Sequence, residues 1–264
     1  MSMVTHISSR RNELIKETAG LVRSVENRRA QGLFVVEGAR LCYDACRSHA
    51  TVERLFFTQK AAEKYGEYLK PLMEQAREVY SIEAHCAELL SDTRSSQGVF
   101  AVCRLPETKS LSSLTLTGKY IAVENLQDPG NLGAVMRTAE ALGISGLILF
   151  GECCDLYSPK TLRAGMGAAF RLPVYHGGAF FAQANDLHQR GFVTYAAVPD
   201  STAEKVTDCT FGDGSILLVG NEGNGLLPET IQACSRRVTI PMGGRAESLN
   251  AATSSAILMW EMVR

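Results

Sequence analysis

The sequence predicts two α/β domains in tandem, the second with a parallel sheet covered by helices on both faces. Short apolar runs alternate with helix-like segments along all 264 residues. In the second half these runs are β-branched and apolar at consecutive positions, as in strands buried on both faces. A Ser- and Thr-rich stretch over 106–118 predicts a linker between domains of residues 1–105 and 119–264.

The first domain opens with a helical pattern over residues 10–30. Strand-like and helix-like segments then alternate, which is typical of a small α/β domain. The expected strands are Leu33–Val36, Val52–Phe57, Glu78–Ser81 and Val99–Cys103, and the expected helices span 39–48, 60–76 and 83–90.

The second domain alternates in the same way, with shorter and more apolar strands. The expected strands are Tyr120–Val123, Gly146–Phe150, Val174–Tyr175, Phe192–Ala197, Ile216–Val219 and Arg237–Ile240. The expected helices span 132–142, 160–168, 178–189, 227–233 and 249–263. The last of these is apolar on more than one face, which predicts a place in the domain centre or at a dimer interface.

Composition indicates a globular chain with one local basic region. Hydrophobic residues make up 45% of the chain, enough for a sizeable core, and the net charge is −1. The first 40 residues nevertheless carry seven basic side chains against four acidic ones. This region is either an RNA-binding surface or a solvated helix face, and charge alone does not separate the two.

The cysteines and apolar runs bear on metals and membranes. Eight cysteines occur without a C-x-x-C pair, so the spacing does not predict a zinc site and favours reduced thiols in the cytoplasm. No signal peptide is expected, because the N-terminus turns polar at Ser8–Asn12. No apolar run approaches the roughly 20 residues that a membrane span requires.

Three loops rich in Gly, Asn and Pro are the candidate functional site. In the first, Asp128-Pro129-Gly130 predicts a turn, and Asn131 is a suitable N-cap for the helix that follows. Arg137 lies further along this helix and suits a phosphate or carboxylate through its forked donors. A surface ion pair with Glu140 is the alternative explanation for Arg137.

The second loop follows a buried strand at the point where ligands bind in α/β sheets. Its glycines are spaced as G-x-x-G-x-G from Gly220, which is not the dinucleotide fingerprint. They bracket Glu222, a carboxylate at the end of the strand. The alternative is a tight turn with Glu222 as an N-terminal charge for the next helix.

The third loop runs from a short strand at Ile240–Met242 to the last helix. Ser248 and Asn250 precede that helix and are candidates for capping it or for hydrogen-bonding a ligand beside Gly243-Gly244. Irregular loops at the ends of parallel strands converge on one edge of the sheet, so we expect the three loops to form one pocket.

Together the three loops resemble the SpoU (TrmH-like) branch of the SPOUT RNA methyltransferases. The matching segments are N-L-Q-D-P-G-N-L-G-A-V-M-R-T-A, L-V-G-N-E-G-N-G-L and I-P-M-G-G-R-A-E-S-L-N, in that order. Ser9-Arg10-Arg11-Asn12 and the segment from Arg28-Arg29 to Glu37-Gly38 are similar to the substrate-binding domain of many members. The resemblance therefore covers nearly the whole chain.

The resemblance implies a C-terminal SPOUT domain with a deep trefoil knot, preceded by a smaller α/β domain like a ribosomal protein. It implies a cytoplasmic homodimer that binds S-adenosylmethionine, needs no metal and methylates a ribose 2′-hydroxyl of RNA, with 23S rRNA favoured. By position it implies catalytic roles for Arg137, Asn131, Glu222, Ser248 and Asn250. The implied cofactor-binding residues are Ala197, Gly220, Asn221, Gly225, Ile240, Met242 and Leu249, and the implied RNA-binding residues are Arg10, Arg11, Arg28 and Arg29.

The role of Arg137 needs a separate physical argument. A ribose hydroxyl must lose its proton around the transition state, yet an arginine with a pKa above 12 does not normally accept one. We therefore prefer a role in which Arg137 clamps an RNA phosphate and orients and acidifies the hydroxyl.

Three other functions are alternatives to the rRNA 2′-O-methyltransferase. A tRNA 2′-O-methyltransferase would use the same chemistry. A non-catalytic RNA-binding or ribosome-assembly module is disfavoured by the complete set of polar residues in the three loops. An ordinary nucleotide-cofactor enzyme is disfavoured by the order of the glycines and by the lack of an early glycine loop.

Overall fold

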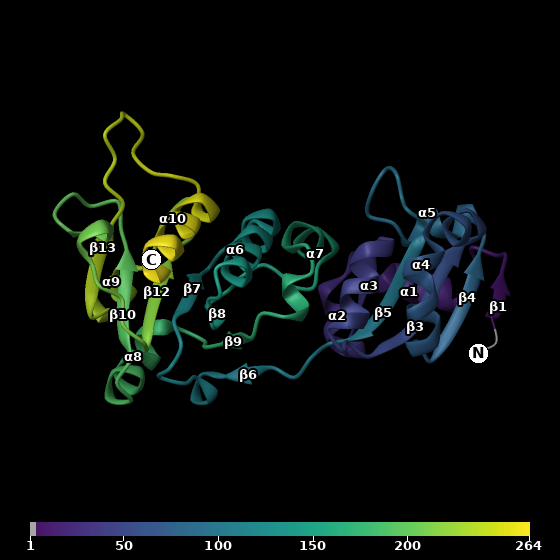
Figure 1. Cartoon of the computed structure of the whole chain (residues 1–264), viewed down its shortest axis with the longest axis horizontal. Helices are drawn as coiled ribbons and strands as arrows, with labels where there is room; N and C mark the ends of the chain where they lie inside the picture. Colours follow the sequence, from purple (N-terminus) through teal and green to yellow (C-terminus); the bar gives the residue numbers. More distant parts are fainter. Residues whose placement is uncertain (1–3) are drawn as a thin grey trace. The chain divides into compact units, whose positions relative to one another are not determined.

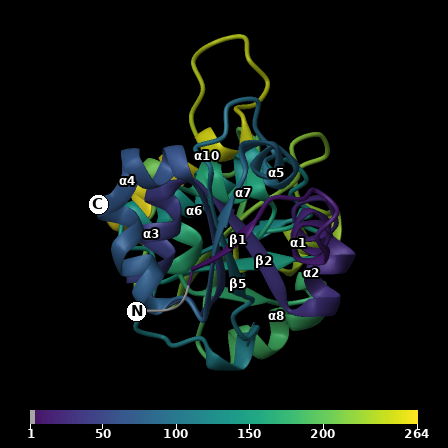
Figure 2. The same cartoon turned by 90° about the vertical axis from the view of Figure 1, so that its right-hand side faces the viewer.

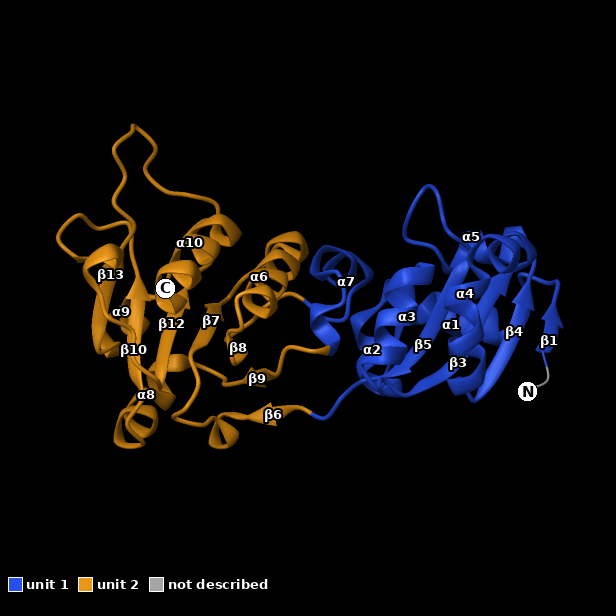
Figure 3. Cartoon of the chain, in the orientation of Figure 1, with its two compact units in different colours: residues 1–107, 155–170 blue, residues 108–154, 171–264 orange. Residues whose placement is uncertain are grey.

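The computed structural model describes residues 4–264 and divides the chain into two compact units. Unit 1 contains the chain up to Glu107 together with Asp155–Phe170, and unit 2 contains Thr108–Cys154 and Arg171–Arg264 (Figure 3). The chain therefore passes from one unit to the other three times.

Unit 1 is a five-stranded sheet of order β1-β4-β3-β5-β2, in which β5 runs antiparallel to β3 and β2. Helices α3 and α4 cover one face, and α1 and α5 cover the other (Figure 2). The strands are β1 (Val4–Ile7), β2 (Leu33–Glu37), β3 (Val52–Thr58), β4 (Glu78–Ile82) and β5 (Val99–Arg104). The helices are α1 (Glu13–Arg23), α2 (Val25–Gln31), α3 (Ala39–Arg47), α4 (Gln59–Gln75) and α5 (Ala84–Leu90).

The single helix expected over residues 10–30 is two helices. Asn12 caps α1, and the chain leaves the helical conformation at Ser24 (φ −124°), whose hydroxyl accepts from the backbone N–H of Asn27 and starts α2. Gly32 ends α2 in the left-handed conformation (φ +65°), where a residue without Cβ is favoured. Strand β1 was not expected, because its four residues include three polar or exposed positions.

Unit 2 is an eight-stranded sheet of order β11-β13-β10-β12-β7-β8-β9-β6, and all its neighbouring strands are parallel. Helices α6 and α10 pack against each other, while α8 and α9 pack together with the core on the opposite face (Figure 1). The strands are β6 (Lys109–Ser110), β7 (Tyr120–Glu124), β8 (Gly146–Phe150), β9 (Val174–His176), β10 (Val193–Ala197), β11 (Glu204–Lys205), β12 (Ser215–Val219) and β13 (Arg236–Thr239). The helices are α6 (Pro129–Ala141), α8 (Phe180–Gln189), α9 (Pro228–Ala233) and α10 (Ala251–Val263).

The segment expected as a linker, 106–118, is largely part of unit 2. Strand β6 pairs in parallel with β9, and a 3₁₀ turn follows at Leu111–Ser113. Leu111 and Leu114 are buried in the core of unit 2. Ser and Thr suggested a flexible connection, but two leucines at this spacing anchor the segment.

Residues 155–170 form an excursion from unit 2 into unit 1, between β8 and β9. The excursion contains α7 (Pro159–Gly165) and a 3₁₀ turn at Ala168–Phe170. Leu162 belongs to the apolar core of unit 1, and the Tyr157 ring lies 4.8 Å from the Phe34 ring between centroids. The sequence predicted the helix here but not the unit it joins.

Arg28 ties this excursion to the first two helices. Its guanidinium donates to Asp155 Oδ2 at 2.7 Å from Nε, and to the carbonyls of Leu21 at 2.5 Å and Val22 at 3.2 Å. Arg28 is only 5% exposed. A buried guanidinium whose donors are satisfied inside the protein is a structural group, so this position contradicts the expectation that Arg28 contacts RNA.

Arg28→Ala is expected to destabilise the protein by about 3 kcal/mol, because it leaves the Asp155 carboxylate and two carbonyls without their partner. The neighbouring Arg29 is exposed, so Arg29→Ala is expected to change stability by less than about 0.5 kcal/mol. Urea unfolding of the two variants measures the difference. Equal stabilities would contradict a structural role for Arg28.

Three further features concern membrane helices, thiols and metal ligands. Along residues 4–264, no helix combines the length and apolar character needed to cross a lipid bilayer. All eight cysteines are free thiols, and burial raises the pKa of Cys103 to about 12. The described residues contain no group of three or more His, Cys, Asp or Glu side chains suited to a metal ion.

Candidate active site

The three polar loops meet at the carboxyl edge of the unit 2 sheet. Strands β7, β12, β10 and β13 are parallel, so the chain leaves all four at the same edge. The loops that follow β7, β12 and β13 are the three segments that the sequence singled out. This edge is where open α/β sheets bind ligands.

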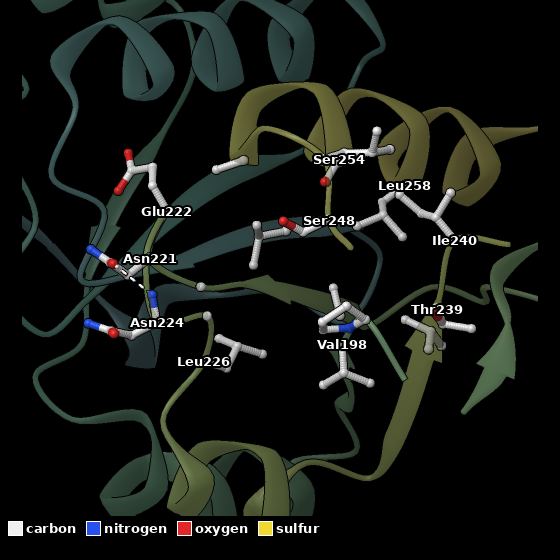
Figure 4. A pocket seen from close by; sticks show the side chains of 18 of the residues that line it. Val198, Asn221, Glu222, Asn224, Leu226, Thr239, Ile240, Ser248, Ser254 and Leu258 are labelled. Carbon is white, nitrogen blue, oxygen red and sulfur yellow. Dashed lines mark hydrogen bonds between the residues drawn. The ribbon is translucent and has the colours of Figure 1, made fainter. Parts of the chain in front are cut away.

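A cavity of about 320 Å³ lies among these loops. Its lining includes the apolar residues Val198, Leu226 and Leu258 and the polar residues Asn221 and Ser248. In Figure 4, Leu258 of α10 lies across the cavity from Leu226 and Val198. A largely apolar lining with a few polar groups suits a small organic ligand with an apolar part and a charged or polar part.

Every residue that the resemblance implied for the cofactor lines this cavity. The set is Ala197, Gly220, Asn221, Gly225, Ile240, Met242 and Leu249. The cavity also has lining residues that were not foreseen, among them Val198, Pro199, Val219, Leu226, Thr239, Ser254 and Leu258. Most of these are apolar residues in or beside strands or in α10, so the sequence marks them as core rather than as cavity wall.

A hydrogen-bond network joins the three loops beside the cavity. Glu222 Oε1 accepts from Asn131 Nδ2 at 3.0 Å and from the backbone N–H of Asp128 at 3.1 Å. Asn131 Oδ1 in turn accepts from Asn250 Nδ2 at 3.0 Å. Asn131 therefore connects the second loop to the third, and a change at any one of these side chains disturbs the others.

The local structure explains how these side chains are held. Asp128, rather than Asn131, is the N-cap of α6, since its carboxylate accepts from the backbone N–H of Asn131. This frees the Asn131 side chain for Glu222 and Asn250. Asn250 is the N-cap of α10 through the N–H groups of Ala252 and Thr253. It both starts the last helix, as expected, and donates to Asn131, a contact that the sequence did not predict.

Glu222 serves the start of α6 and not the start of α9. Burial raises the pKa of its carboxyl, but hydrogen bonds from Asn131 and from the backbone N–H groups of Glu222, Asp128 and Gln127 outweigh that effect. The net pKa lies below the ordinary value of 4.5. The group is therefore an anion at neutral pH, held at the N-terminus of a helix.

A lowered pKa in the folded state means that ionised Glu222 stabilises the fold above its ordinary pKa. This contribution is expected to disappear as the pH falls from about 4.5 through the lower folded-state pKa. Glu222→Gln should therefore melt at a lower temperature than wild type near pH 7, with a difference that shrinks below pH 4.5. Glu229→Gln, an exposed carboxylate on α9, is the control. A difference that stays constant from pH 7 to pH 3 would contradict this account.

Arg137 and Ser248 lie outside the hydrogen-bonded network. Ser248 lines the cavity. Arg137 lies about two turns beyond Asn131 on α6, is exposed and does not line the cavity. The alternative ion pair with Glu140 is not formed, because Glu140 accepts from Arg171 at 2.7 Å. An exposed guanidinium outside the cavity is placed to meet a second, larger ligand.

The loops around the cavity pack closely at one point. A Cβ on Gly220 would lie 2.0 Å from the carbonyl carbon of Gly225 and 2.1 Å from the backbone nitrogen of Leu226. Asn221 and Gly225 close the loop with two backbone hydrogen bonds of 3.0 Å. The glycine at position 220 therefore lets the strand end and the far side of the loop touch.

The structure places the N-terminal arginines in three different environments. Arg11 and Arg29 are exposed. Arg10 is half-exposed, forms an ion pair of 2.5 Å with Glu88 and donates to the carbonyl of His85. Arg28 is buried, as described above. Of the seven basic side chains expected to form a surface in the first 40 residues, Arg28 is therefore buried, and Arg10 and Lys16 form ion pairs with Glu88 and Glu13.

The fold and the cavity define a parallel α/β domain that binds a small organic ligand beside a network of polar side chains. Residues 118–260 match the SpoU rRNA Methylase family, and residues 12–101 match the MRM3-like substrate binding domain. The chain therefore belongs to the SpoU rRNA methylase family.

Relatives with similar sequences and structures span nearly the whole chain. The 23S rRNA (guanosine(2553)-2′-O)-methyltransferase RlmP of Bacillus subtilis is 27% identical over 97% of this chain and 98% of its own. The 23S rRNA (uridine(2479)-2′-O)-methyltransferase of Streptomyces viridochromogenes is 28% identical over 96% of this chain and 90% of its own. The crystal structure of an AdoMet-bound rRNA methyltransferase from Sinorhizobium meliloti has a TM-score of 0.87 at 25% identity, over 98% of this chain and 97% of that one.

Proposed function

We propose that this protein transfers a methyl group from S-adenosylmethionine to a ribose 2′-hydroxyl of 23S rRNA. The observation that carries the proposal is the convergence of three family loops on one cavity, joined by the Glu222–Asn131–Asn250 network. Relatives that cover nearly the full length methylate 23S rRNA at a 2′-oxygen, as their names state.

The cavity suits S-adenosylmethionine in its size and in its combination of apolar and polar lining residues. The close approach of Gly220 to Gly225 leaves backbone, not side chain, facing the ligand at the strand end. Ala197, Ile240 and Leu249 would hold the cofactor along the wall. The bound cofactor would supply an electrophilic methyl group on a sulfonium, whose sulfur would leave as a neutral thioether.

The reaction would form a bond between the ribose 2′-oxygen and the methyl carbon, break the bond from that carbon to sulfur, and release the hydroxyl proton to water. Arg137 clamps an RNA phosphate, which holds the hydroxyl in line and favours loss of its proton. Asn131, Glu222 and Asn250 hold the cavity loops in register. Ser248, on the cavity wall, is placed to hydrogen-bond the cofactor or the nucleotide.

Unit 1 is the part that we assign to RNA recognition, in agreement with its match to a substrate-binding domain. Exposed arginines such as Arg11 and Arg29 contact phosphates, with Arg10 as a partly engaged third. Arg28 is not included. Unit 2 is the methyltransferase domain.

The last helix supports a homodimer. Trp260 is 56% exposed and Val263 is 36% exposed on α10, an apolar surface rarely left in water. Trp260→Glu is expected to convert the dimer to a monomer, as light scattering would measure. A wild-type protein that is already monomeric at micromolar concentration would contradict the proposal.

Two further properties follow from family membership. We propose that the C-terminal segment threads through the domain and forms a deep trefoil knot. When the chain is pulled from both ends, the knot should tighten and remain as a compact stretch in the otherwise extended chain. The eight free thiols and the rRNA substrate support a cytoplasmic location.

Methyl transfer from radiolabelled S-adenosylmethionine to separate, unmodified 23S rRNA, 16S rRNA and tRNA tests the proposal, with ribose methylation mapped on any labelled RNA. Label at a 2′-oxygen of 23S rRNA is the expected result. Label in tRNA alone would replace the substrate but keep the chemistry. RNA binding without methylation of any fraction would favour a non-catalytic assembly factor.

A further inference from the structure

A carboxylate is buried at the end of the central strand β7. Glu124 is 2% exposed and follows four apolar, buried residues of that strand. Its Oε2 accepts from the backbone N–H of Leu227 at 2.9 Å, and its Oε1 accepts from the hydroxyl of Thr230 at 2.5 Å. A buried carboxylate persists only where donors compensate for the lost water.

Both donors follow closely after the 220–226 loop, which lines the cavity. Leu227 is the N-cap residue of α9, and its apolar side chain makes no cap hydrogen bond. The carboxylate of Glu124, from a distant part of the sequence, instead holds the N–H of Leu227 and the hydroxyl of Thr230 in the first turn of α9. It therefore fixes the point where the loop after β12 ends and α9 begins.

The residue that follows β7, Asn125, holds the other end of the same loop. The Asn125 carbonyl accepts from Asn221 Nδ2 at 2.8 Å. Asn125 has a positive φ of +54°, an uncommon conformation for a residue other than glycine. The loop is therefore fastened to the end of β7 at Asn221 and again at Leu227, with Gly223 and Gly225 between the two attachments.

We propose that Glu124 is a positioning residue for the cofactor. It acts through the 220–227 loop, whose residues Gly220–Leu226 line the cavity. This inference rests on the proposed function, since it takes S-adenosylmethionine as the ligand of the cavity. If the carboxylate loses either donor, the far end of the loop is released, and the backbone that faces the cofactor becomes less ordered.

The test compares three variants with wild type. Glu124→Asp shortens the side chain so that it cannot reach both donors, and Thr230→Val removes one of them. Each is expected to raise the Kd and KM for S-adenosylmethionine about tenfold, equivalent to about 1.4 kcal/mol, while kcat at saturating cofactor stays within about threefold. In Glu124→Gln the amide oxygen still accepts from the Leu227 N–H, and the amide nitrogen donates to the Thr230 hydroxyl. The KM of this variant for S-adenosylmethionine should therefore stay within about threefold of wild type.

Thr194→Val is the matched control for general destabilisation. Thr194 is fully buried in β10 of the same sheet, and its hydroxyl lies 2.8 Å from His188 Nε2 and accepts from the N–H of Ser235. Its loss should lower the melting temperature without changing the cofactor Kd.

Two results would overturn the inference, and they are distinguishable. If wild type binds the cofactor and Glu124→Asp and Thr230→Val only melt earlier, as Thr194→Val does, Glu124 is structural and the proposed function stands. If wild type does not bind S-adenosylmethionine by calorimetry, the proposed function fails and this inference fails with it.

Discussion

Arg137→Ala is expected to lower methyl transfer by about 10²–10³-fold while the affinity for S-adenosylmethionine stays within about twofold. The reason is position. Arg137 is exposed on α6 and does not line the cofactor cavity, so its loss removes the proposed contact to RNA and none to the cofactor. Single-turnover methylation of 23S rRNA, combined with calorimetry of cofactor binding, measures the two effects separately.

Arg137→Lys distinguishes a forked clamp from a simple positive charge. Lysine keeps the charge but cannot form two parallel hydrogen bonds to a phosphate, so this variant should be nearly as slow as Arg137→Ala. Arg236→Lys is the matched control, because Arg236 is also exposed but begins β13, at the amino end of that strand. Near-wild-type turnover of Arg137→Lys would rule out the clamp.

Gly220→Ala is expected to weaken cofactor binding by about 10²-fold or more, since a shift of about 1 Å in a binding site has effects of that size. The new Cβ would lie within 2.1 Å of two backbone atoms, the carbonyl carbon of Gly225 and the nitrogen of Leu226. Backbone on both sides cannot move aside as a flexible side chain does. The 220–226 loop must therefore open, and the part of the cavity wall that it forms moves with it.

Gly223→Ala in the same loop is the control for Gly220→Ala. Its Cβ would meet only Asn221 Oδ1, at an ordinary 3.5 Å. Calorimetric titration with S-adenosylmethionine should therefore separate the two alanine variants. If both bind like wild type, the close packing at Gly220 is unrelated to cofactor binding.

The sequence predicted the strands of unit 2 well because their burial leaves a direct signal. Runs such as Gly146–Phe150 and Ser215–Val219 are buried at every position, and the parallel sheet that holds them was expected. The three loops could be grouped for a related reason, since parallel strands end at a common edge. Their glycines and polar residues stand out against apolar neighbours.

Other features could not be predicted because they depend on partners far away in the chain. Arg28 looks like a surface arginine until Asp155, 127 positions later, is placed beside it. Glu124 ends an apolar strand, and only its donors at 227 and 230 show why a carboxylate is buried there. Strand β6 is two exposed residues whose only signal is their pairing with β9.

The excursion of residues 155–170 limits how these two units can be inherited. A recombination event at the boundary near residue 107 would deliver a methyltransferase unit whose Tyr157, Leu162 and Phe170 had lost the apolar partners that pack around them in unit 1. A new recognition unit could be accepted only with matching changes in a segment encoded some 50 codons downstream. The two units should therefore descend together, and hybrids of distant homologues should require the excursion to be exchanged along with the N-terminal unit.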